Sequence, residues 1–197
     1  MNSSERGSSL IEMLGVICII GTITVMMMGG ISITMRRFKI TQANRQVNHN
    51  VKDIRNAFSA DVPTIPQTGK SAAKQLFDAG ILDKSDVSTD DSGNYAATTV
   101  YGSEMDIRVS PSDGEDAYFT ITYKDMPSGV CIDLLQLDFG DDPSDGLKSI
   151  SVSGSESALA KTTFDWNSNS HKLMPQMAQI VEACKSSRSD ITWKFYL

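Results

Sequence analysis

A run of 23 residues without a charged side chain, residues 13–35, constrains this chain more than any other feature of its sequence. Glu12 precedes the run, and Arg36 and Arg37 follow it. As an α-helix it would be about 34 Å long, enough to cross a bilayer. A secretory signal peptide is the alternative, but its apolar part is only about 7 to 15 residues long. The run therefore predicts a transmembrane helix.

The residues after this run continue the helix with an amphipathic pattern. Apolar side chains recur at spacings of three and four, which is typical of one helical stripe, at Ile40, Ala43, Val47, Val51, Ile54 and Phe58. Polar residues are expected on the opposite face, among them Arg45, Gln46, Asn50, Asp53 and Arg55. Since no proline precedes Pro63, we expect one helix over residues 9–60, about 75 Å long. Its second half offers one apolar stripe to a globular head.

The rest of the chain predicts an α+β head. Pro63, Pro66 and Gly69 end the long helix. We expect helices at 70–79, 127–135 and 173–184, and a polar loop at 85–94. Alternating residues predict strands at 96–101, 105–110, 117–123 and 148–153, and a strand at 191–196 that seals the sheet. The domains are then a leader at 1–7, the long helix at 8–60 and the head at 61–197.

The net charge of -6 is unevenly distributed along the chain. Residues 8–55 carry a net charge of +4, and residues 56–197 carry -10. A basic helix with an acidic head suits packing between copies, although an acidic head is also explained by solubility alone. Phosphate binding needs clustered Lys and Arg, so no nucleic acid is predicted as a partner of the head.

The three cysteines differ in their surroundings. Cys18 lies inside the apolar run, where it is expected to serve as a small apolar residue. Cys131 and Cys184 lie in the head and can form a disulfide if the head is extracytoplasmic, which would stabilise it by about 4 kcal/mol in the chain-entropy model. Two unrelated buried thiols in a reducing compartment are the alternative.

The first 14 residues contain a specific combination of features. Gly7 ends a short polar leader, Ser8 follows it, and Glu12 is the fifth residue after Gly7 in an otherwise apolar helix. This combination resembles the class III signal of type IV pilin precursors. The C-terminal half resembles the type IVb branch of this family, particularly the PilS-like major pilins of thin, conjugative pili. The resemblance lies in the segment 119–123, in Pro127 and Cys131, and in residues 183–184 and 191–195.

The resemblance implies a structural filament subunit and not an enzyme. It implies cleavage between Gly7 and Ser8 by a prepilin peptidase, N-methylation of Ser8, and a role for Glu12 in assembly. The implied partners are other copies of the chain, the pilus platform and motor, and the membrane before assembly. The implied location is the inner membrane of a bacterium and then an extracellular pilus, used for adhesion, motility or conjugation.

Two glycines replace a residue that many members of this family have. A proline commonly occupies the twenty-second mature position, and Gly29 and Gly30 stand there in this chain. Two glycines inside a helix cost roughly 2 kcal/mol relative to alanine, so they would loosen the helix during assembly. The alternative, weighed equally, is that they allow helices to approach closely.

Enzyme and metal sites find little support in the sequence. Residues 71–74 fit the S-x-x-K pattern of penicillin-recognising enzymes, but the partner motifs S-D-N and K-T-G are missing. Neither His49 nor His171 has an acid or Cys at metal-ligand spacing on its own element. An acidic loop with Asp138 and Asp145 could hold Ca²⁺, but a solvated loop is favoured. We predict no cofactor and no metal.

The function predicted from the sequence is therefore that of a type IV pilus subunit. The nearest alternative is a minor pilin or a pseudopilin of a type II secretion system. An alternative from another class is a membrane-anchored binding domain that does not polymerise.

Overall fold

The computed structural model of the chain describes residues 4–58, 69–89, 93, 95–110, 117–137, 146–154, 162–165 and 175–196. Residues 4–10, 24–33, 58, 69–72 and 110 are described by their backbone alone. The chain divides into two compact units, Met1–Thr41 and Gln42–Leu197.

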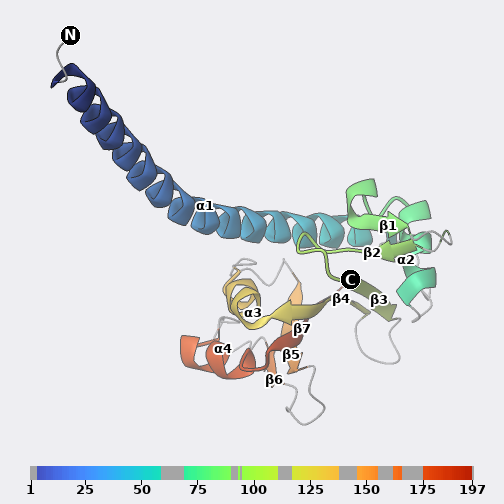
Figure 1. Cartoon of the computed structure of the whole chain (residues 1–197). Helices are drawn as coiled ribbons and strands as arrows, with labels where there is room; N and C mark the ends of the chain where they lie inside the picture. The colour runs from blue at the N-terminus through green and yellow to red at the C-terminus, as the bar shows by residue number, and fades with distance from the viewer. Residues whose placement is uncertain are drawn as a thin grey trace. The chain divides into compact units, whose positions relative to one another are not determined.

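One helix occupies the N-terminal part of the chain (Figure 1). This helix, α1, spans Ser4–Phe58, and the expected end at residues 59–60 lies outside the described residues. Among the described residues, none of the helices combines the length and the apolarity that a membrane crossing needs. The side chains of residues 24–33, which lie inside the expected span, are not described. The transmembrane role of residues 13–35 stays a prediction.

A five-stranded antiparallel sheet forms the centre of the second unit (Figure 1). Its strand order is β3-β4-β7-β5-β6. The bounds are Met105–Ser110 for β3, Tyr118–Pro127 for β4, Leu147–Gly154 for β5, Thr162–Asp165 for β6 and Arg188–Tyr196 for β7. The expected sealing strand at 191–196 is therefore a central strand, because β7 pairs with β4 on one side and with β5 on the other.

A smaller region connects α1 to this sheet. It contains α2 (Gly69–Asp78), the short 3-10 helix η1 (Lys84–Asp86) and a two-stranded antiparallel sheet of β1 (Val87–Thr89) and β2 (Tyr95–Ala97). Two predictions are wrong here. Residues 87–89 form a strand instead of a polar loop, and the strand expected at 96–101 ends at Ala97. A turn replaces its last residues, with Gly102 at φ 80° and the Thr99 amide bonded to the Ser103 carbonyl at 2.8 Å.

Two short helices accompany the large sheet. Helix α3 spans Ser128–Leu135, close to the prediction of residues 127–135. Helix α4 spans Met177–Ala183, and residues 166–174, which include the expected start at 173, lie outside the described residues.

The apolar stripe of α1 packs into the core of the second unit. Ala43, Val47 and Ile54 have no exposed surface and share a core cluster with the sheet residues. The rings of Phe119 and Phe195 stack at 5.3 Å between centroids on neighbouring strands. A helix with one buried stripe thus covers one face of an antiparallel sheet, as its periodicity predicts.

Two polar residues of α1 are also buried. Gln46 is 7% exposed and Asn50 is fully buried, although the sequence places both on the solvated face. The Asn50 side chain donates to the Met105 sulfur at 3.6 Å, and its oxygen has no partner among the described residues. The prediction was wrong because helical periodicity places every polar residue on the solvent-exposed face. In this structure the sheet provides a hydrogen-bonding partner for Gln46, the Tyr123 hydroxyl.

Candidate functional site

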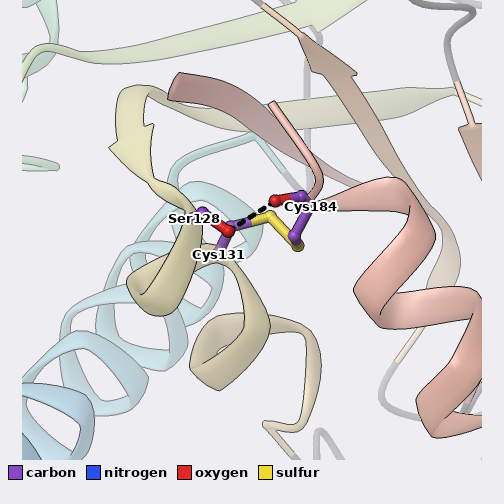
Figure 2. Close-up of a disulfide and its surroundings, with 3 residues drawn as sticks. All are labelled: Ser128, Cys131 and Cys184. Atoms are coloured by element: carbon purple, nitrogen blue, oxygen red, sulfur yellow. Dashed lines mark hydrogen bonds between the residues drawn. A yellow bond between two sulfur atoms is a disulfide. The ribbon is translucent and has the colours of Figure 1, made fainter. Parts of the chain in front are cut away.

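A disulfide closes the C-terminal part of the head (Figure 2). It joins Cys131 on α3 to Cys184, which caps the C-terminus of α4, and the two Cα atoms are 5.8 Å apart. Both cysteines are fully buried. The Ser128 hydroxyl donates to the Cys184 carbonyl at 2.6 Å, so a second bond joins the same two segments. The predicted pairing of the two head cysteines is confirmed, and Cys18 is free and exposed.

The first half of α1 lies in the unit Met1–Thr41, and its apolar side chains are exposed in that unit. Ile11 is 77% exposed and Ile17 is 61% exposed. The same holds for the other described large apolar residues of this half, namely Met13, Leu14, Val16, Ile19, Ile20, Ile23, Met35 and Phe38. Glu12 is exposed among them. A surface of this kind is unusual for a soluble monomer and marks a site of contact with a membrane or another protein.

Two glycines of this half, Gly15 and Gly21, have open space around them among the described residues. A Cβ added to Gly15 or to Gly21 would meet no atom within 4 Å outside the helix's own backbone. Gly7, Ser8, Gly29 and Gly30 also lie within the helical span of α1. Since only the backbone is described at these four positions, their predicted roles in cleavage, methylation and flexibility stay predictions.

A polar contact on the second half of α1 joins three parts of the head. The Tyr123 hydroxyl donates to Gln46 Oε1, and Gln46 Nε2 donates to the Thr98 carbonyl at 3.1 Å. Asp86 also shares a side-chain hydrogen bond with Gln46. Gln46 therefore bonds to β4, to the residue after β2 and to η1 at once. The sequence did not predict this role of Gln46, because a single Gln in a helix carries no local pattern that indicates a buried hydrogen-bonding partner.

An open depression of about 380 Å³ lies beside Gln46. His49 on its wall has its Nδ1 2.9 Å from Asp53 Oδ2 and its Nε2 4.0 Å from Asp83 Oδ2. The prediction that His49 has no acid at metal-ligand spacing on its own element is wrong, because Asp53 lies one turn away on the same helix. Arg45 and Asp86 also line the depression.

Burial changes the acidity of two groups around Gln46. Desolvation raises the pKa of Asp86, and the charge of Asp83 raises it further. The hydrogen bonds from Gln46 and Ser85 and the charge of His49 act in the opposite direction. Burial also raises the pKa of Tyr123, which keeps its hydroxyl a hydrogen-bond donor.

The described residues contain no group of three or more His, Cys, Asp or Glu side chains that could hold a metal ion. His171 and the acidic loop at 138–145 lie outside the described residues. Residues 71–74, which match S-x-x-K, lie on α2, where the side chains of 71 and 72 are not described.

The arrangement defines an α+β protein with a long N-terminal helix, an antiparallel sheet and a C-terminal disulfide. No protein-family model and no curated protein matches the sequence. Among solved structures, the chain is similar to a type IVb pilin from Salmonella typhi, with a TM-score of 0.54 and 13% identity over 79% of this chain and 98% of that one. It is also similar to TcpA, a type IV pilin from Vibrio cholerae El Tor, with a TM-score of 0.50 and 12% identity over the same shares. The chain has the type IV pilin fold.

Proposed function

We propose that this chain is the precursor of a structural subunit of a type IV pilus of the type IVb branch, with no enzymatic role. The observation that carries the proposal is the exposed apolar half of α1, attached in sequence to a disulfide-closed head with the pilin fold. Exposed apolar surface on this scale needs a membrane or other copies of the same helix to cover it.

The glycines of α1 support contact between helices. A glycine inside a helix costs about 1 kcal/mol relative to alanine. Among the described residues, no neighbour lies close enough to Gly15 or Gly21 for the absence of a side chain to offset this cost. Small residues let neighbouring helices approach closely in membranes and in bundles, so these positions fit a bundle of copies.

The proposal includes a processing route. A prepilin peptidase cleaves between Gly7 and Ser8, and the new amine of Ser8 is methylated. The subunit is held in the inner membrane by residues 13–35 until the pilus platform and motor add it to a filament outside the cell. Glu12 then fixes the position of each subunit against its neighbour. The support is the sequence pattern and the exposure of Glu12.

Two other functions share parts of this description. A minor pilin or a pseudopilin would use the same helix, and a membrane-anchored binding domain would not polymerise. Type IVb pilin is preferred because a solved type IVb pilin matches this chain over 98% of its own length.

The decisive experiment is intact-mass measurement of surface material, combined with electron microscopy of sheared filaments labelled for this chain. The expected mass is that of residues 8–197 with one added methyl group and one disulfide, in labelled filaments. A mature chain that keeps residues 1–7 and remains monomeric in the membrane would contradict the proposal and favour the anchored binding domain.

A further inference from the structure

A β-bulge interrupts β4 shortly before the strand ends. The pairing of β4 with β7 shifts register between Tyr123 and Met126, and both of these side chains are fully buried. Residues three apart in a regular strand point to opposite faces, so the bulge is what brings Met126 into the core together with Tyr123. Among the described residues, Asp125 is the one non-glycine residue with a positive φ, at 60°. This conformation is uncommon outside glycine and persists where neighbouring groups hold it.

Two side chains of β7 hold the bulge. Arg188 Nη1 donates to the Asp125 carbonyl oxygen at 3.0 Å and to Asp125 Oδ2 at 2.9 Å. The Asp125 amide donates to Asp190 Oδ1 at 2.8 Å. An exposed ion pair contributes little by itself, but these three bonds involve charged groups and converge on one residue, so they fix its backbone. We call Asp125, Arg188 and Asp190 the bulge clamp.

The bulge clamp lies where both cysteine-bearing segments leave the sheet. The last pair of the ladder between β4 and β7 is Pro127 with Arg188. Cys131 lies four residues after Pro127, and Cys184 lies four residues before Arg188. The two cysteines are therefore at equal distances along the chain from the same ladder pair. The Ser128 hydroxyl donates to the Cys184 carbonyl at 2.6 Å and adds a further bond between the two segments (Figure 2).

We infer that the bulge clamp positions Cys131 and Cys184 for oxidation, so that the folded head holds the two thiols together before the disulfide exists. The bonds of the clamp involve no sulfur, so reduction of the disulfide leaves them in place. The Cα separation of 5.8 Å is ordinary for a disulfide, so the segments need no rearrangement for the sulfurs to join. Thiols held together in this way have a high effective concentration, which makes the disulfide form readily and resist reduction.

Equilibrium with glutathione and glutathione disulfide measures this effective concentration. One head thiolate attacks a sulfur of glutathione disulfide and releases one glutathione, and the other head thiolate then attacks the mixed disulfide and releases the second. The head loses two protons and two electrons, and glutathione disulfide is reduced to two glutathione molecules. The experiment uses the full-length chain in detergent micelles, with Cys18→Ser so that Cys131 and Cys184 are the reacting pair. The ratio of oxidised to reduced chain then gives the effective concentration.

Variants of the clamp should lower the effective concentration. We expect a fall of at least about fivefold in Arg188→Met and in Asp190→Ala, because Asp125 loses charged partners in each. Asp190→Asn keeps the Oδ1 acceptor and should retain most of the natural value. Lys124→Met is the matched control, because it breaks an exposed ion pair of β4 with Glu104, at 2.7 Å, that does not involve β7. It should change the value by less than about twofold.

A further control separates positioning from overall stability. Val109→Ala truncates a buried side chain on β3, the edge strand on the far side of β4 from β7, so it lowers the stability of the head. Because the clamp is intact in this variant, the effective concentration should stay close to the natural value. An equal fall in Val109→Ala and Arg188→Met would overturn the inference, since overall stability alone would then set the position of the thiols.

The inference also requires that the natural chain keeps its native near-UV signal after reduction, and loss of that signal would overturn it. An unchanged effective concentration in Arg188→Met would overturn it as well. If Arg188→Met does not fold in its oxidised form, Asp190→Ala decides the question, and the natural value in that variant would refute the role of the clamp.

Discussion

The hydroxyl group of Tyr123 on β4 donates a hydrogen bond to the buried amide oxygen of Gln46 on α1. Both residues are nearly inaccessible to solvent, and the Tyr123 ring packs edge-on against Trp193 at 5.1 Å. The bond thus joins the helix to the centre of the sheet in a region where an unpaired oxygen would be costly.

Tyr123→Phe should lower the free energy of unfolding by about 1–3 kcal/mol, because Gln46 loses a donor and stays buried. Chemical denaturation of the chain in detergent measures it. Tyr118→Phe, on the half-buried outer side of β4, is the control and should change the stability by no more than about 0.5 kcal/mol. A loss for Tyr118→Phe as large as that for Tyr123→Phe would contradict the argument.

Stability should fall in alkali through the same tyrosine. Burial raises the Tyr123 pKa, so the unfolded chain loses its phenolic proton near pH 10 while the folded chain keeps it. Stabilisation is full below about pH 10 and decreases as the pH rises further. Denaturation between pH 9 and pH 10.5 measures how steeply the free energy of unfolding falls with pH. A Cys18→Ser background removes the free thiol from this measurement. Tyr123→Phe should flatten this slope, and an equal slope in that variant would exclude Tyr123 as the cause.

The disulfide should contribute substantially to the stability of the head. Replacing Cys131 or Cys184 by Ser should reduce the free energy of unfolding by about 2–5 kcal/mol, because the loop between them becomes free in the unfolded chain. Non-reducing peptide mapping should find the pair oxidised and Cys18 alkylatable. Head thiols that react with alkylating reagent in the natural folded chain would contradict an oxidising location.

A side chain at Gly146 should destabilise the head. Its φ of 65° favours glycine, and an added Cβ would displace the guanidinium of Arg55, which donates to the Tyr196 carbonyl at 3.3 Å. We expect Gly146→Ala to cost about 1–3 kcal/mol. Gly102→Ala is the matched control, because Gly102 also has positive φ but open space around it. Thermal or chemical denaturation should rank Gly146→Ala as the more damaging variant, and the reverse order would exclude the Arg55 contact.

Glu12→Leu should block assembly without blocking membrane insertion. A carboxylate inside an apolar helix costs about 2.5–3.5 kcal/mol on insertion scales, so the substitution favours the membrane. In the proposed filament, Glu12 is the negative partner of the Ser8 amine of a neighbouring copy, and the substitution would remove that partner. We expect processed subunits in the membrane and few filaments by electron microscopy. Cys18→Ala should assemble normally as the control. Filaments at the natural level in Glu12→Leu would refute the assembly role.

The elements that the sequence predicts well are those with a strong period. The stripe from Ala43 to Ile54 identified α1, and alternation in β4 and β7 located those strands, because one face of each is buried. The strand β6 was missed, since only Phe164 among its four residues is large and apolar, and its pairing with β5 defines it.

The parts that the sequence did not predict depend on tertiary partners. Gln46 and Asn50 are buried because the sheet meets them with Tyr123 and Met105, which are 77 and 55 residues away. The contact of His49 Nδ1 with Asp53 Oδ2 is local and could have been predicted from the four-residue spacing. The approach of Asp83 to the same ring could not, since it requires η1 to pack on α1.

The central position of β7 has a consequence for the order of events during synthesis. Strand β7, Arg188–Tyr196, leaves the ribosome after all the other strands of the sheet. Strands β4 and β5 are nevertheless joined only through β7, which pairs with both. The nascent head therefore cannot complete its core while it is being made, and it must be translated almost fully before it folds. A prematurely terminated product would present two open strand edges, which are sites of aggregation and of recognition by quality-control proteases.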